Sequence, residues 1–77
     1  MNESESDAVN VTVRVAKDFR EQFAEIVKHL GEAGLVDAEP HKRFLLVNGA
    51  IPRDGISRLA AIEGVASVRQ DETYRAL

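Results

Sequence analysis

The sequence contains no cysteine, no tryptophan, two prolines and only four aromatic residues among its 77 positions. Without cysteine the chain has no disulfide to stabilise it and no thiol for catalysis or metal binding. Its length suffices for one domain, and a domain of this size buries only about 60–65% of its unfolded surface. We therefore expect a single domain of modest stability, without a metal ion or a cofactor.

Long apolar runs and clusters of like charge are also missing. No apolar run approaches the ~18–20 residues that span a membrane. The net charge is −3, and Lys and Arg are interspersed with Asp and Glu rather than gathered in a basic stripe. Nucleic-acid binding usually depends on clustered cations, often with stacking rings. The sequence therefore predicts neither a nucleic-acid partner nor a membrane partner.

The first eight residues, Met-Asn-Glu-Ser-Glu-Ser-Asp-Ala, are acidic and polar. A secretory signal would be basic and then apolar, so no such signal is visible. We expect residues 1–8 to be a disordered segment. The localisation is unknown from the sequence, with the cytoplasm as the default expectation.

No catalytic group can be recognised. His29 lies near the end of a predicted helix and His41 in a predicted turn, so a solvent-exposed role is expected for both. No serine is placed with a histidine and an acid in a pattern that the sequence reveals. The Ala16-Lys17 loop lacks the glycines of a phosphate cradle. We expect that the protein is not an enzyme.

Alternating valines define the first strand, at Val9, Val11, Val13 and Val15. Polar residues stand between them, which is the period-two pattern of a strand with one buried face. Further strands are predicted at residues 35–39, 43–48 and 65–70, with a turn at residues 40–42. Residues 43–48 are apolar on both faces, which is typical of a central strand. Asn48-Gly49 is expected to end that strand.

A first helix is predicted over residues 18–31. Its apolar side chains recur at helical spacing, at Phe19, Phe23, Ile26, Val27 and Leu30. Asp18 and Glu21 have the spacing of a capping box at its start. Gly31 and Gly34 supply the stop.

A second helix is predicted, starting near Pro52 or Asp54 and ending at Gly64. The order βαββαβ then predicts a ferredoxin-like α+β plait, a four-stranded antiparallel sheet with two helices on one face. The valines should meet the helices, which leaves an open sheet face formed by Asn10, Thr12, Arg14, Ser67 and Arg69. One side of the strand 43–48 joins that face, and an apolar residue there indicates a partner surface.

No glycine, proline or helix signal follows the last predicted strand. We expect a folded domain over residues 9–71 and an extended tail over residues 72–77. The tail ends with a large, a charged, a small and an apolar side chain, in the order Tyr74, Arg75, Ala76 and Leu77. An extended segment of this kind binds in a groove of another protein by strand addition, with alternate side chains in pockets.

Several stretches occur together in a set order: the alternating valines, Phe44-Leu45-Leu46-Val47, Ile56-Ser57-Arg58-Leu59, and Ile62-Glu63-Gly64-Val65-Ala66-Ser67-Val68-Arg69-Gln70-Asp71. The last stretch is the most specific, because it spaces two valines before an acidic segment. With these motifs, residues 9–77 resemble the propeptide domains of subtilisin-type serine proteases and their free-standing relatives, the proteinase inhibitor I9 family.

The resemblance implies a mode of binding. In that family the open sheet face packs on two parallel helices of the protease, an acidic residue after the last strand caps those helices, and the tail runs through the substrate cleft. The corresponding residues are Asp71 at the cap, Leu77 in the first specificity pocket, Ala76 in the second and Tyr74 in the fourth. Family members carry further acids before the cap, where this chain has Arg69 and Gln70, so Glu72 is an alternative cap.

The resemblance implies a monomeric, noncovalent inhibitor of a subtilisin-like serine protease, or a folding helper that acts on it in trans. No protease follows Leu77 in the sequence, so we expect an inhibitor, a separate helper or a piece trimmed from something larger. The alternative function is a regulatory or oligomerising plait. In that case the open face pairs with a second copy, or the loops bind a small metabolite, and the tail is idle.

Overall fold

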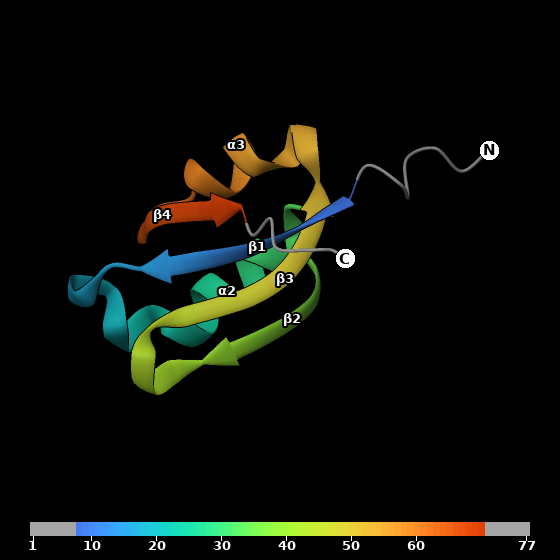
Figure 1. Ribbon diagram of the computed structural model, residues 1–77. Coiled ribbons are helices and arrows are strands. Elements are labelled where there is room, and N and C mark those ends of the chain that lie inside the picture. Colours follow the sequence, from blue (N-terminus) through green and yellow to red (C-terminus); the bar gives the residue numbers. More distant parts are fainter. Residues whose placement is uncertain (1–7, 71–77) are drawn as a thin grey trace.

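The computed structural model describes residues 8–70, which form a four-stranded antiparallel sheet with two helices (Figure 1). The strands are β1 Ala8–Val15, β2 Val36–His41, β3 Leu46–Pro52 and β4 Val65–Gln70. The helical elements are η1 Lys17–Gln22, α2 Phe23–Glu32, η2 Lys42–Phe44, η3 Arg53–Gly55 and α3 Ile56–Ala60, where η marks a 3₁₀ helix. The βαββαβ order and the strand order β2-β3-β1-β4 confirm the predicted ferredoxin-like α+β fold.

Strand β1 lies inside the sheet, between β3 and β4. Three of its valines are almost fully buried, with Val11 1%, Val13 0% and Val15 2% exposed. Because successive side chains of a strand point to opposite faces, the residues between these valines face away from the core. The first strand is confirmed, and it begins at Ala8, inside the segment that was expected to be disordered.

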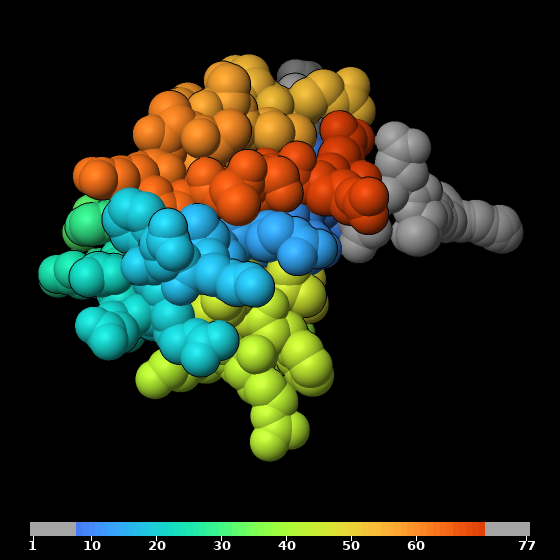
Figure 2. Space-filling model, turned by 90° about the vertical axis from the view of Figure 1, so that its left-hand side faces the viewer, coloured from blue at the N-terminus to red at the C-terminus, as the bar shows by residue number. Residues whose placement is uncertain are grey.

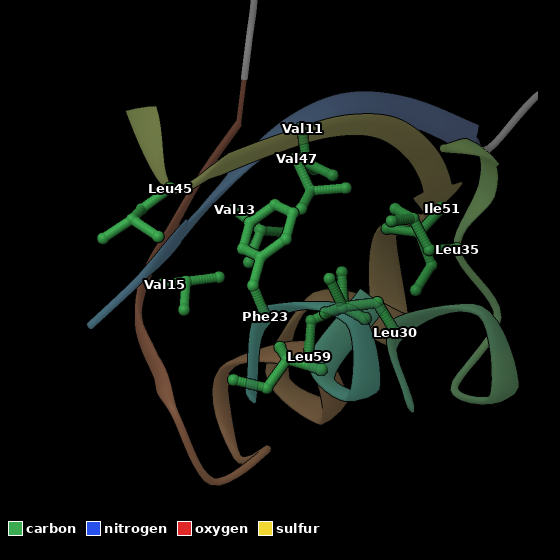
Figure 3. Close-up of a cluster of buried hydrophobic side chains, with 11 residues drawn as sticks. Val11, Val13, Val15, Phe23, Leu30, Leu35, Leu45, Val47, Ile51 and Leu59 are labelled. Atoms are coloured by element: carbon green, nitrogen blue, oxygen red, sulfur yellow. The ribbon is translucent and has the colours of Figure 1, made fainter. Parts of the chain in front are cut away.

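The core fills the space between the sheet and the helices, as Figure 3 shows. Helix α2 contributes Phe23, Ile26 and Leu30 to it, and α3 contributes Leu59. The strands and turns supply the rest, at Val11, Val13, Val15, Leu35, Leu45, Val47 and Ile51. Within residues 8–70 no polar or charged side chain is buried. Burial of apolar surface, worth about 25 cal/mol per Å², is therefore the main stabilising interaction in the interior.

Helix α2 ends in a Schellman motif. The amide of Leu35 donates to the carbonyl of Leu30 at 3.0 Å, and the amide of Gly34 donates to the carbonyl of Gly31 at 3.1 Å. Gly34 has φ +118°, a conformation that costs a residue without a Cβ little. The predicted stop at Gly34 is confirmed, and the motif turns Leu35 back into the core beside Leu30.

The start of the first helix differs from the prediction. Residues 17–22 form a 3₁₀ helix, and Phe19 departs from helical geometry at φ −108° and ψ 19°. No side chain caps η1 or α2, so the capping box predicted at Asp18 and Glu21 does not form. The ring of Phe19 packs against Gly64, where an added Cβ would lie 3.1 Å from Cδ2. In this conformation Phe19 lies outside a regular first turn, which a capping box requires.

The predicted strand over residues 43–48 is wrong in its boundaries. Residues 42–44 form η2, and Leu45 follows in the left-handed region at φ 55° and ψ 43°. Strand β2 instead continues to His41 through Pro40, which an edge strand tolerates. Phe44 thus lies in a 3₁₀ turn outside the sheet, with 65% of its surface exposed. The apolar run over residues 44–47 did not indicate this turn, because Leu45 is apolar and buried although it lies in the turn.

Strand β3 continues through Asn48-Gly49, where the sequence indicated a break. Gly49 is needed in this strand for packing, because a Cβ there would lie 2.8 Å from Cγ of Leu35. The second helix is also shorter than predicted, as η3 and α3 together end at Ala60. The last strand is confirmed at Val65–Gln70.

Exchanging Gly64 for alanine tests the contact between the α3–β4 turn and the first helix. Gly64 has φ +97°, and its added Cβ would lie 2.5 Å from Cδ1 of Ile26. Backbone strain and overpacking together predict that Gly64→Ala lowers the free energy of unfolding by about 2–4 kcal/mol. Urea unfolding followed by circular dichroism measures this change.

Gly31→Ala is the matched control, since nothing lies within 4 Å of the added Cβ. Gly31 lies within α2, so this exchange is expected to raise the free energy of unfolding by about 0.5–1 kcal/mol. Equal stability of the two variants would contradict the packing described here.

Candidate functional site

The surface of the sheet opposite the helices is the candidate functional site, and we call it the open sheet face. In Figure 1 the strands lie in front of α2, so this face is turned toward the viewer. Along β1 and β3 its residues alternate with residues that face the core, and the register places residues of β2 and β4 beside them. They are Asn10, Thr12 and Arg14 of β1, Leu46, Asn48 and Ala50 of β3, Glu39 and His41 of β2, and Ser67 and Arg69 of β4.

Four of the five residues predicted for this face line one hollow. Thr12 pairs with Arg69 across the β1–β4 ladder, and Arg14 pairs with Ser67. Together with Leu46 they surround a hollow of about 360 Å³. Leu46 is half-buried and lies opposite Arg14 on β3, so it is the apolar residue expected on this face. The hollow is therefore lined by two guanidinium groups, two hydroxyl groups and one apolar side chain.

Asn10, the fifth predicted residue, lies apart from this group. It lines a second hollow of about 330 Å³ toward β2, where Asp37 and Glu39 supply negative charge. The open sheet face is consequently polarised, with cations beside β4 and acids beside β2. A partner would need the opposite arrangement of charge to pack closely on it.

A chain of hydrogen bonds crosses three strands of the open sheet face. The hydroxyl of Thr12 donates to Oδ1 of Asn48 at 3.0 Å. The amide nitrogen Nδ2 of Asn48 then lies 3.3 Å from Nε2 of His41 and donates to it. A neutral His41 must carry its own proton on Nδ1 for this arrangement. The chain fixes the orientation of three exposed side chains that would otherwise sample several rotamers.

Asn48 and His41 were not predicted to form part of a site. They were missed because residues 40–42 were interpreted as a turn and Asn48-Gly49 as a break. The available signal was the alternation of Val47, Gly49 and Ile51, which places the residues between them on the other face.

The predicted tail and cap residues lie outside the described residues. These are Asp71, Glu72, Tyr74, Arg75, Ala76 and Leu77. The last described residue before them is Gln70, which ends the edge strand β4 and pairs with Val11.

A group of cations at one end of the molecule was also missed. Lys17 and Arg20 of η1 approach Lys42 and Arg43 of η2, although the two pairs are far apart in the sequence. An antiparallel pairing of β1 with β3 brings the end of one strand beside the start of the other. The predicted pairing of the strands therefore indicates that these cations meet, although they form no continuous basic stripe in the sequence.

Within residues 8–70, no cluster of three or more metal-ligating side chains is present. No helix in that range is long and apolar enough to cross a membrane. Comparison with protein-family models, with curated proteins and with solved structures finds no significant match for this chain. The geometry of the molecule is therefore the basis for a function.

The tautomer of His41 tests the hydrogen-bond chain. We expect neutral His41 to carry its proton on Nδ1, because Nε2 accepts from Asn48. Asn48→Ala removes that donor, so the ring should shift toward the tautomer protonated on Nε2. Proton–nitrogen correlation spectra of the imidazole at alkaline pH distinguish the two forms.

Asn10→Ala is the control for this measurement, because Asn10 lies on the same face without a bond to His41. It should leave the tautomer unchanged. A proton on Nε2 in the unaltered protein would show that the chain does not run as described.

Proposed function

We propose that this chain is a noncovalent inhibitor of a subtilisin-like serine protease, or a folding helper that acts on one in trans. The observation that carries the proposal is the open sheet face, which no element within residues 8–70 covers and which gathers four of the predicted contact residues around one hollow. The ferredoxin-like fold adds support, because it is the fold that the resemblance to subtilisin propeptides implies. No catalytic residue is assigned to the chain.

In this proposal the open sheet face packs on two helices of the protease. Arg14 and Arg69 are its main cations, so the enzyme has to present carboxylates near them. Leu46 supplies apolar contact beside Arg14. Because the hydrogen-bond chain from Thr12 to His41 already orients its members, less side-chain entropy is lost on binding.

The segment after β4 provides the second contact. The last described residue, Gln70, ends the edge strand β4 and follows Arg69, which lines the hollow. Tyr74, Arg75, Ala76 and Leu77 would lie extended in the substrate cleft, with Leu77 nearest the catalytic serine. Asp71 would cap the positive N-termini of the protease helices, with Glu72 as its neighbour.

The direct test is titration of the purified chain into a subtilisin while peptide hydrolysis is followed over time. The proposal predicts competitive inhibition that fades as the tail is cleaved. Unchanged hydrolysis at a large excess of the chain over several subtilisins would contradict it. A tight dimer in gel filtration that buries the open sheet face would favour the oligomerising alternative.

Leu77→Asp tests the tail. Burial of a leucine side chain contributes about 1.5–3 kcal/mol, so this exchange should raise the inhibition constant by roughly 10- to 150-fold. Ala24→Asp introduces the same charge at an exposed position of α2 and serves as the control. If both variants inhibit as well as the parent chain, the tail does not enter the cleft.

Asp71→Lys tests the cap independently of the tail. Loss of an anion at a helix N-terminus costs about 0.3–1 kcal/mol, or ~2 kcal/mol when partly buried, which is a roughly 2- to 30-fold weaker inhibition. Asp54→Lys is the control, since Asp54 is an exposed acid in η3. An inhibition constant equal to that of the control would refute the cap and leave the tail in place.

A further inference from the structure

The end of the molecule formed by η1 and η2 carries two adjoining hollows that the proposed function does not use. Their volumes are about 480 and 420 Å³, and Arg20 and Arg43 line both of them. We call the two together the basic hollow. Figure 2 looks onto this end, where the yellow-green segment around η2 projects beside the cyan η1 segment.

The rim of the basic hollow is strongly cationic. Its charged residues are Arg14, Lys17, Arg20, Lys42 and Arg43, all of them exposed. Among residues 8–70, no acidic residue lines either hollow. Five of the nine Lys and Arg residues within positions 8–70 thus line the basic hollow, whereas the acids Asp18 and Glu21 of η1 are exposed nearby and are not among its lining residues. Such a separation of charge produces a local positive potential that attracts anions, whatever the net charge of the chain.

Apolar residues lie between these cations. Val15, Ala16, Leu45 and Ala66 line the floor of the larger hollow. Phe44 forms one wall, and 65% of its surface is exposed. Phe44 and Val36 are the two large apolar side chains exposed within the described residues. Aromatic and arginine side chains are enriched at protein–protein interfaces, and Phe44 lines the same hollow as Arg20 and Arg43.

We propose that the basic hollow binds an extended acidic segment of a partner protein that carries an apolar side chain among its carboxylates. The cations match the carboxylates, and the apolar floor with Phe44 matches the apolar side chain. The surface is independent of the protease-binding residues apart from Arg14, which lies between the two.

Two other anionic partners fit this surface less well. Single-stranded nucleic acid binds to rows of aromatic rings, and the basic hollow has one ring. An anionic bilayer requires apolar side chains that project together from a convex surface, whereas here one phenylalanine stands beside a concavity. A peptide can fill the concavity and satisfy both the rim and the floor.

Fluorescence polarisation with labelled peptides of roughly ten residues tests the proposal. One peptide has a central leucine flanked by glutamates, and a second has serine in place of that leucine. The leucine peptide should bind saturably and weaken markedly between low and physiological salt, because the contacts are charged and near the surface. The serine peptide should bind several-fold more weakly.

The double exchange Arg20→Glu with Arg43→Glu should weaken binding of the leucine peptide at least tenfold. Lys28→Glu with Arg53→Glu changes the charge by the same amount at exposed positions outside the hollow, and should alter affinity less than twofold. Circular dichroism of each variant verifies folding. Phe44→Ser should weaken binding of the leucine peptide and leave the affinity for the serine peptide unchanged. This result would distinguish the contribution of Phe44 from that of the cations.

Three results would overturn the proposal. One is equal affinity of both double variants for the leucine peptide. Another is tighter binding of an oligothymidylate than of the leucine peptide, which would indicate a nucleic-acid surface. The third is binding to phosphatidylserine vesicles that depends on Phe44 while neither peptide binds, which would indicate a membrane surface.

Discussion

The valine face of β1 is the constraint on which the rest of the structure depends. Val11, Val13 and Val15 are buried against the helices, and β1 is hydrogen-bonded to a strand on each side. Because strand side chains alternate, burial of these valines fixes Thr12 and Arg14 on the opposite face. A shift of one residue in register would bury an arginine and expose the core. The open sheet face is therefore held in place by the packing of the interior.

Within residues 8–70, the buried side chains that stabilise the fold are apolar, and the charged and polar side chains lie at the surface. No polar or charged side chain is buried within residues 8–70, so the charges and hydrogen-bonding groups of the described side chains are accessible to partners. They are unevenly distributed, with cations at the end formed by η1 and η2 and acids beside β2. Three glycines leave room for core side chains, since Gly49 packs against Leu35, Gly55 against Ile51 and Gly64 against Ile26. A domain of this size has few other ways to gain stability.

Apolar periodicity, a helix-ending glycine and the order of elements were the sequence features that predicted the fold correctly. The valines located β1, Gly34 located the end of α2, and the order of elements predicted the fold. The start of β3 was missed, because Leu45 is apolar and buried yet lies in a left-handed turn rather than in a strand. The spacing of apolar residues indicates which positions are buried. A buried position can lie in a strand or in a turn, and the spacing alone does not distinguish the two.

The same reasoning applies to the candidate sites. The alternation within β1 and β4 predicted Thr12, Arg14, Ser67 and Arg69 on one face, and the register brings them around one hollow. The basic hollow depends on segments that meet only in the folded chain, so no local pattern revealed it. Its cations come from β1, η1 and η2, each of which contributes one or two.

Nuclear magnetic resonance can test directly whether the open sheet face binds a subtilisin, as we propose. Amide signals of the labelled chain would be followed during addition of a subtilisin whose catalytic serine has been replaced, so that the tail stays intact. We expect the signals of Thr12, Arg14, Ser67 and Arg69 to shift or broaden, while those on the exposed side of α2 do not. Shifts confined to α2 and α3, or none at saturating protease, would contradict it.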